Sequence, residues 1–491
     1  MMKKVNSRII LPLVSLALFH FVPFFTYYSD NSNDYETSRK PYPYFLYPFS
    51  TINAYGSSTI EDNNNNEGFI GDTGSGIRFD NVTNFTDNPN DSVYGQVAAS
   101  ENNVYVVWEE STTSDSSNDN YDIYIRKSAD QGETFTKNNN DSAMDTTEVI
   151  NLSNNPGFSE HPQIAAYKEK VHVAWIDDSL GNKEILFSRS IDNGTTFSEA
   201  INISNTTNTN SHNLEISAFE NDVYIVWLDE DEEENGIILF KASNDGGETF
   251  SNPITIAQNV NNNDDDLTLP KVVAHGNSVY IAWNVADNTQ GEEMITDLFY
   301  VKSSNQGNTF SPPIKLNNNG EKVGEAQLAA YNNTVYVVWG STPYDEVTSN
   351  LFFVRSIDNG NTFSNPTEVT NVNFENPSNV EIAVAGNDNN VERSSEQSLW
   401  TSSPPASSQQ GHKEPHVYIA SQVPLSDENE EIFLASSSDN GDTFSEVTFN
   451  LSNNSEFSEC PSIAISENNI YVIWQDSTPG NNEVFFSKAR I

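Results

Sequence analysis

Seven short apolar segments recur along the chain, and most of them end in tryptophan. They read VYVVW (104–108), VHVAW (171–175), VYIVW (223–227), VYIAW (279–283), VYVVW (335–339), VYIAS (417–421) and IYVIW (470–474). Their final residues lie 52 to 82 positions apart. Nearly continuous runs of β-branched and aromatic residues are typical of strands that are buried on both faces. The pattern therefore predicts a repeat protein built from sheets.

Each apolar segment lies within a larger unit of four predicted strands. A strand with small residues precedes it, such as QIAA (163–166), and a third strand such as EILFSR (184–189) follows it. A short fourth strand, such as EVINLS (148–153), completes the unit. Four antiparallel strands in about 50 residues are typical of a β-propeller blade. We predict an all-β, seven-bladed propeller, or six blades if the sixth unit, with Ser421 in place of tryptophan, does not form.

The turn after the third strand contains the most specific motif of the repeat. Its six copies read SADQGETF (128–135), SIDNGTTF (190–197), SNDGGETF (243–250), SSNQGNTF (303–310), SIDNGNTF (356–363) and SSDNGDTF (437–444). A carboxylate can accept hydrogen bonds from the amides of such a turn, and glycine can adopt the left-handed conformation that it needs. We assign a turn-building role to the third residue of each copy: Asp130, Asp192, Asp245, Asn305, Asp358 and Asp439.

These turns resemble the Asp-box, or BNR, repeat of the sialidase-like propeller superfamily. The resemblance covers residues from about 79 to 491, nearly everything after the N-terminal region. It implies that the boxes lie at the blade rims, between the third and fourth strands and remote from the active face. It therefore implies a structural role for them, and we assign no catalytic residue.

The two ends of the repeat complement each other. The seventh unit stops at residue 491 without a fourth strand, and the segment 79–88 is similar to the fourth-strand pattern of the other units. We expect this N-terminal strand to complete the last blade, which would close the ring and leave no open edge.

The region before the propeller has two parts. Lys3, Lys4 and Arg8 precede an apolar run over 9–25, a pattern typical of an export signal, so we predict an extracellular or cell-surface protein. No small-residue cleavage site follows, so residues 1–29 form a signal peptide or a signal anchor. Only this segment would attach the protein to a membrane. Residues 30–76 have the composition of a low-complexity linker, which leaves 77–491 for the propeller.

Composition limits the partners of the protein. The chain has 70 acidic and 23 basic residues and a formal net charge of −47, which excludes nucleic acid as a partner. The single cysteine, Cys460, excludes an internal disulfide and a cysteine-based zinc cluster. We expect a monomer with a protein or carbohydrate ligand.

The resemblance also implies a catalytic alternative. Sialidases of this superfamily hold the sugar carboxylate with three arginines and use a tyrosine, a glutamate and an aspartate in the reaction. Here Arg189 and Arg355 directly precede the turn motif at the predicted rim, and the negative charge of the chain would repel an anionic sugar. We therefore predict a non-catalytic recognition or scaffold module for a protein or glycan. A sialidase-like glycoside hydrolase of the exo-α-sialidase type is the alternative.

The candidate binding residues begin the innermost predicted strands. In a ring they would surround the mouth of the central channel, a usual position for a ligand, although they could also line a water-filled channel. They are Gln96, Gln163, Glu215, Lys271, Gln327 and Glu381, with Ser462 in the seventh unit.

Two further features point to a ligand less directly. The acidic loops between second and third strands could hold Ca²⁺, with Asp229, Asp231 and Glu232 as candidate ligands, or form a solvated face. No other cofactor is predicted. An insertion over 387–415, which contains Trp400, separates the first two strands of the sixth unit and would be either functional or disordered.

Overall fold

The structure is a computed structural model. It describes residues 70–71, 77–112, 120–135, 149–233, 235–258, 265–287, 295–318, 321–343, 349–369, 377–386, 414–426, 429–445 and 449–491. The chain divides into two units, 1–52 and 53–491, and all of these residues belong to the second. The predicted export segment, most of the predicted linker and most of the insertion therefore lie outside the described residues. Within the described ranges there is no helix with the length and hydropathy needed to cross a membrane.

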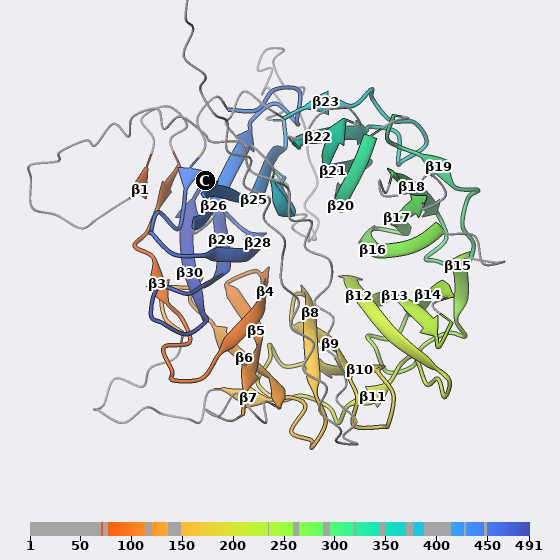
Figure 1. The fold of residues 1–491 in the computed structure, drawn as a ribbon, viewed down its shortest axis with the longest axis horizontal. Coiled ribbons are helices and arrows are strands. Elements are labelled where there is room, and N and C mark those ends of the chain that lie inside the picture. Colours follow the sequence, from red (N-terminus) through yellow and green to blue (C-terminus); the bar gives the residue numbers. More distant parts are fainter. Residues whose placement is uncertain are drawn as a thin grey trace, which may run out of the picture. The chain divides into compact units, whose positions relative to one another are not determined.

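The described residues form thirty strands in seven antiparallel sheets, which are arranged as the blades of a ring (Figure 1). Blade 1 contains β4 (Ser92–Ser100), β5 (Asn103–Ser111), β6 (Tyr121–Ser128) and β7 (Ile150–Asn151). Blade 2 contains β8 (Ser159–Tyr167), β9 (Lys170–Asp177), β10 (Glu184–Ser190) and β11 (Ile201–Asn202). Blade 3 contains β12 (Thr209–Phe219), β13 (Asp222–Asp231), β14 (Gly236–Ser243) and β15 (Ile254–Gln258). Blade 4 contains β16 (Asp265–His275), β17 (Ser278–Asp287), β18 (Ile295–Ser303) and β19 (Ile314–Lys315).

The remaining three blades complete the ring. Blade 5 contains β20 (Glu321–Tyr331), β21 (Thr334–Pro343), β22 (Asn350–Ser356) and β23 (Thr367–Glu368). Blade 6 contains β24 (Ser378–Ala385), β25 (His416–Ser426), β26 (Asn429–Ser437) and β27 (Phe449–Asn450). Blade 7 contains β28 (Ser458–Ser466), β29 (Asn469–Asp476) and β30 (Glu483–Arg490), with β1 (Ile70–Gly71), β2 (Arg78–Phe79) and β3 (Thr83–Asn84) from the N-terminal side. The seven-bladed prediction is confirmed, and the sixth unit forms a blade despite Ser421.

The N-terminal strands close the ring as predicted. Strand β3 pairs with β30 in the fourth-strand position, with Thr83 opposite Phe486. Strand β2 also pairs with β30, with Phe79 opposite Ala489. Strand β1, which lies in the region predicted as linker, adds a further pair to β2. Blade 7 is thus a sheet built from both ends of the repeat, which covers the edge that β30 would otherwise expose.

Hydrophobic cores lie between neighbouring blades, because side chains of the second strand alternate between the two sides of each blade. In β5, Val106 and Trp108 pack toward blade 7, whereas Tyr105 and Val107 pack toward blade 2. All four side chains are at most 1% exposed. This arrangement explains why the second strand is the most continuously apolar segment of each repeat.

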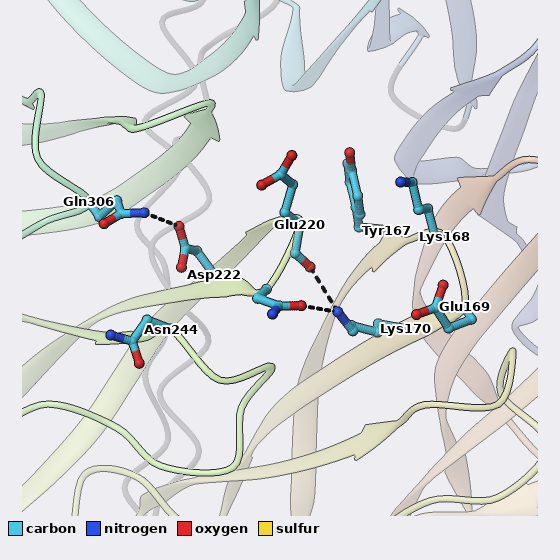
Figure 2. Close-up of a pocket in the computed structure, with 9 residues that line it drawn as sticks. Tyr167, Lys168, Glu169, Lys170, Glu220, Asp222, Asn244 and Gln306 are labelled. Atoms are coloured by element: carbon cyan, nitrogen blue, oxygen red, sulfur yellow. Dashed lines mark hydrogen bonds between the residues drawn. The ribbon is translucent and has the colours of Figure 1, made fainter. Parts of the chain in front are cut away.

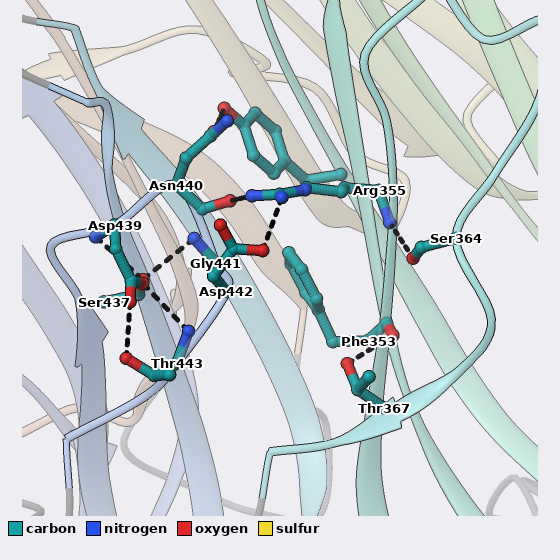
Figure 3. A network of polar contacts seen from close by, with 11 residues as sticks. Phe353, Arg355, Ser364, Thr367, Ser437, Asp439, Asn440, Gly441, Asp442 and Thr443 are labelled. Carbon is teal, nitrogen blue, oxygen red and sulfur yellow. Dashed lines mark hydrogen bonds and ion pairs between the residues drawn. The ribbon is translucent and has the colours of Figure 1, made fainter.

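We call the six turn motifs the Ser–Asp turns; five share one hydrogen-bond pattern, and in the sixth Asn305 donates to the Thr309 hydroxyl instead of accepting from it. In the copy of blade 6, Ser437 Oγ donates to Asp439 Oδ1 at 2.7 Å and accepts from the Gly441 amide at 2.8 Å (Figure 3). Thr443 donates its amide to Oδ1 and its hydroxyl to Oδ2 of Asp439, at 2.9 and 2.5 Å. Gly441 has a φ of +83° and its position for a Cβ would lie 2.5 Å from Phe353 of blade 5, so glycine is required there.

A basic side chain links the Ser–Asp turn of one blade to the preceding blade. Arg355 of blade 5 donates to the Asn440 carbonyl at 2.6 Å and to the Asp442 carboxylate at 2.5 Å in blade 6 (Figure 3). Equivalent contacts join Lys127 to Asn193, Arg189 to Gly246, Lys302 to Asn359 and Lys488 to Glu133. The basic residues before the turns therefore connect blades at the rim.

We expect Asp358→Ala to lower the free energy of unfolding by about 1–2 kcal/mol, because four hydrogen bonds to its carboxylate are lost. Asp358→Asn should cost less, since Asn305 occupies the same position in blade 4 and still accepts from Ser303 and the Thr309 amide. Urea unfolding of the two variants measures the difference. If the alanine and asparagine variants lose the same stability, the oxygen that asparagine retains does not hold the turn.

One buried position differs between blades. The second residue of the apolar segment is tyrosine in six blades and His172 in blade 2. His172 is fully buried against Phe187, with ring centroids 5.9 Å apart, and neither of its nitrogens has a hydrogen-bond partner among the described residues. Burial, with Lys170 and Arg189 nearby, lowers the pKa of His172 to about 3.

We expect His172→Phe to raise the free energy of unfolding by about 1–2 kcal/mol at pH 7, because it removes two unsatisfied buried nitrogens. The folded protein keeps His172 neutral, while the unfolded chain protonates it below about pH 6.5. Native stability is therefore lost as the pH falls below that value, and the gain from the variant should grow at pH 5. Urea unfolding at both pH values tests this. A gain that shrinks at pH 5 would contradict the assignment.

Candidate functional site

The first strand of each blade lies next to the axis of the ring (Figure 1). These inner strands all start on one face, where the second strands end, and we call it the strand-start face. They end in hairpins on the opposite face. The Ser–Asp turns lie on that face too, because each third strand ends beside the start of the second, as Ser437 pairs with Val417. We call it the turn face.

A β-bulge interrupts every inner strand near its start. The residue at the bulge has a φ between +44° and +52° in six blades: Tyr94, His161, Asn213, Leu269, Asn379 and Cys460. Each of these residues precedes one of the predicted binding residues by two positions. A bulge changes the direction of the side chains around it, which is a common device beside functional sites.

Four of the seven predicted binding residues meet in one place. Lys271 on β16 lies at the centre, with its Nζ 3.2 Å from Glu215 Oε2 on β12 and 2.5 Å from Glu325 Oε1 on β20. Gln327 on β20 donates to Glu381 Oε1 on β24 at 2.6 Å. We call these five residues, which come from four successive blades, the axial cluster. The side chains of Lys271, Glu215 and Glu325 are 13%, 18% and 25% exposed.

The charges of the axial cluster are unbalanced. Three carboxyl groups surround one ammonium group, and burial opposes the ionisation of Glu215 and Glu381. Burial is the main cause that raises the pKa of Glu381 to about 8, with Glu215 and Glu325 adding to it and Lys271 opposing it. Burial also raises the pKa of Glu215. Burial would lower the pKa of Lys271, but Glu325, Glu215 and Glu381 outweigh it, so the net shift is upward. At neutral pH the Glu381 carboxyl can therefore act as a donor beside carboxylate acceptors.

The other three predicted residues, Gln96, Gln163 and Ser462, lie elsewhere on the inner strands. Gln96 on β4 accepts a hydrogen bond from Ser462 on β28 at 3.1 Å, which joins blades 1 and 7. Gln163 is half-buried on β8. Four of the predicted residues thus belong to the axial cluster, Gln96 and Ser462 form a smaller polar contact, and Gln163 belongs to neither group.

Sequence reasoning missed Glu325. It stands two residues before Gln327, at the position that the bulge residues occupy in the other six blades. An alignment of the repeats would have shown it as the only acidic residue at that position, although not that it reaches Lys271.

Carboxylates at the ends of the second strands have structural partners. Asp229 is buried and accepts from Trp227 Nε1 at 2.8 Å and Ser211 Oγ at 2.7 Å. The same tryptophan-to-carboxylate bond joins Trp108 to Glu110, Trp175 to Asp177 and Trp474 to Asp476. Asp231 accepts from the Asn235 amide and side chain, and Glu232 is exposed in the same turn. Among the described residues, no group of three or more His, Cys, Asp and Glu side chains could hold a metal ion.

The described arginines lie away from the inner strands. Arg189 and Arg355 connect blades at the rim, and Arg126 on β6 donates to the Phe85 carbonyl at 2.9 Å with its guanidinium over the Phe85 ring. Arg78 and Arg490 face each other in the outer strands of blade 7. No inner strand of the described residues carries an arginine. Lys271 on β16 provides the positive charge of the axial cluster.

Raising the pH from 5 to 9 is expected to lower the free energy of unfolding by about 4 kcal/mol through Glu381. Its pKa of about 8 in the folded protein lies above its ordinary value, so only the folded state holds the proton between these two values. The stabilisation is therefore present at low pH and is lost as the pH rises through 8. Chemical unfolding of the wild type and of Glu381→Gln across this range tests it. If the free energy of unfolding falls equally steeply with pH in both proteins, other groups cause the pH dependence.

Comparison with known proteins finds similarity in structure only. No protein-family model matches the chain, and no curated protein sequence matches it. Among solved structures it is similar to a Hadza microbial sialidase, with 12% identity, 76% of this chain and 74% of that chain covered, and a TM-score of 0.44. A protein of unknown function from Dyadobacter fermentans is 14% identical and has a TM-score of 0.47, with 85% of this chain and 100% of that chain covered. The GH93 α-L-arabinofuranosidase of Fusarium graminearum is 13% identical and has a TM-score of 0.44, with 68% of this chain and 93% of that chain covered. Likeness at this level concerns architecture, and the propeller follows from the strand pairing of the chain itself.

Proposed function

We propose that this protein is a recognition module that binds a protein or carbohydrate ligand at the axis of its propeller, on the side of the strand-start face. The observation that carries the proposal is the axial cluster. Five polar residues from four blades lie together there, and sequence positions up to 166 residues apart provide them. Glu215, Lys271, Glu325 and Glu381 are partly exposed, which leaves polar atoms available to a ligand.

The charges of the cluster favour particular ligand groups. Glu215 and Glu325 on either side of Lys271 attract hydroxyl or ammonium donors, while a protonated Glu381 can donate to a hydroxyl or carbonyl oxygen. An anionic sugar would meet more carboxylates than ammonium groups. A neutral glycan or a protein segment with basic or hydroxyl side chains fits better.

We also propose that the protein acts outside the cell or at its surface, as the N-terminal apolar run after Lys3 and Lys4 suggests. The six Ser–Asp turns would be copies of the Asp-box repeat. Their bonds remain within the turns and the neighbouring blades, which supports a structural role for them.

Binding measurements test the recognition role. The full chain is applied to an array of neutral glycans and to a set of lysine- and serine-containing peptides, and any ligand retained is titrated by calorimetry. Glu325→Gln should weaken binding about tenfold or more, because it removes one side of the axial cluster. Glu199→Gln, an exposed carboxylate far from the inner strands, is the matched control. A ligand bound equally by both variants would place recognition elsewhere.

The second candidate is a glycoside hydrolase of sialidase-like type. It is favoured by the pKa of Glu381, because a protonated carboxyl close to ionised carboxylates is the arrangement that general acid catalysis needs. Fluorogenic glycosides, including a sialoside, test it. Turnover that Glu381→Gln abolishes while the fold is retained would replace the recognition proposal with this one.

A further inference from the structure

Four aromatic rings form an arc around the axis on the turn face, opposite the start of the inner strands. They are the last residues of four successive inner strands: Tyr167, Phe219, His275 and Tyr331. Neighbouring ring centroids are 5.1, 4.9 and 6.0 Å apart. All four side chains are half-buried. The other three blades have Ser100, Ala385 and Ser466 at this position, so the arc occupies one side of the axis.

A hollow of 660 Å³ opens beside one end of the arc. Tyr167 belongs to both features, and Figure 2 shows Glu220, Tyr167 and Lys168 side by side among the residues that line the hollow. The Lys168 ammonium lies 5.5 Å from the centre of the Tyr167 ring. Four of the lining residues are bonded to one another: Gln306 donates to Asp222 at 3.0 Å, and Lys170 donates to Asn221. The volume of the hollow is in the range of ligand-binding pockets.

The lining selects for a ligand without net charge. Two lysines, three acidic residues and three carboxamides supply donors and acceptors in similar numbers, beside a tyrosine. Lys168, Glu220 and Asn244 are exposed, so their polar groups are accessible from solvent. A neutral sugar has the matching chemistry, because its ring offers an apolar C–H face to an aromatic side chain and its hydroxyls both donate and accept.

We propose that the turn face carries a second binding site, for a neutral oligosaccharide. One sugar ring stacks on Tyr167 and Phe219, and its hydroxyls bond to Lys168 and Glu220. The remaining sugars follow the arc toward His275. This site is separate from the axial cluster, which lies toward the other end of the inner strands, so either can exist without the other.

Calorimetric titration of the full chain with cellohexaose, maltohexaose, mannohexaose and chitohexaose tests the proposal. At least one should bind, and Tyr167→Ala or Phe219→Ala should weaken that binding about tenfold, as expected for the loss of an aromatic contact. Tyr167→Phe keeps the ring and should stay within about twofold of the wild type. Leu180→Ala changes an exposed apolar side chain in the loop that joins β9 and β10, on the strand-start face, and should leave the affinity unchanged.

Lys168→Ala gives a variant whose folding is not in question, since the side chain is exposed. It should reduce the affinity severalfold, and thermal unfolding confirms that all variants are folded. Failure of all four sugars to bind overturns the proposal, as does binding that the ring variants leave intact. A proline-rich peptide that binds in place of the sugars and is lost in Tyr167→Ala would assign the arc to a peptide ligand instead.

Discussion

Replacing Lys271 by methionine is expected to lower the free energy of unfolding by about 3–5 kcal/mol at pH 7, because the Glu215 and Glu325 carboxylates of the axial cluster lose their shared counter-charge. The methionine side chain has a similar length, so packing changes little. The loss should be larger at pH 9 than at pH 5, because Glu381 ionises as the pH rises through its pKa of about 8 and adds a further negative charge to the cluster. Urea unfolding at the three pH values measures the effect.

A double variant separates charge from packing. Adding Glu325→Gln to Lys271→Met removes the carboxylate that lies 2.5 Å from the lysine and should restore about half of the lost stability. Glu199→Gln, which is exposed and distant, should restore none. If Lys271→Met costs the same at every pH and neither second substitution helps, the ammonium group is not neutralising the cluster.

Shortening Phe79 to alanine is expected to cost about 3–5 kcal/mol, as for other fully buried phenylalanines. Its side chain is 0% exposed and packs against Phe449 of blade 6, with ring centroids 6.0 Å apart. Its strand pairs with β30, and the next residue, Asp80, donates its amide to the Lys488 carbonyl at 2.8 Å. Losing this contact weakens the strand that closes the ring. Thermal and urea unfolding measure the change.

Two controls accompany the Phe79 variant. Phe457→Ala removes a phenylalanine that is 38% exposed and should change stability by less than about 1 kcal/mol. Phe79→Leu keeps most of the buried volume and should cost roughly a third as much as alanine. A Phe79→Ala protein as stable as Phe457→Ala would show that the closing strand contributes little to the stability of the ring.

The periodic parts of the fold were predictable because each blade repeats the same local chemistry. Apolar five-residue segments gave the second strands, and the Ser–Asp turns marked the ends of the third strands. Ring closure was predictable because the seventh unit has no fourth strand after the one that contains Ser487, and the segment around Thr83 has the pattern of a fourth strand. Blade 6 formed without its tryptophan because β25 is otherwise continuous in its apolar residues, and Ser421 donates to the Ser378 carbonyl.

The axial cluster was only partly predictable. The sequence placed Glu215, Lys271 and Glu381 at equivalent repeat positions, and equivalence is enough to bring them to the axis. It did not reveal Glu325, because the contact of this side chain with Lys271 depends on the bulge near the start of the inner strand. Nor could it show that Arg355 bonds to the turn of the next blade, since the angle between blades is set by packing of side chains distant in sequence.

Because blade 7 contains strands from both ends of the repeat, the two ends of the ring lie close enough to be joined. Arg78 and Arg490 are directly opposite each other in β2 and β30, so the first and last residues of the ring lie one strand spacing apart. A short peptide from Ile491 to Ile77 would make the ring covalently continuous. New ends could then be opened in the loop of any blade, and a circular permutant should keep the same seven sheets.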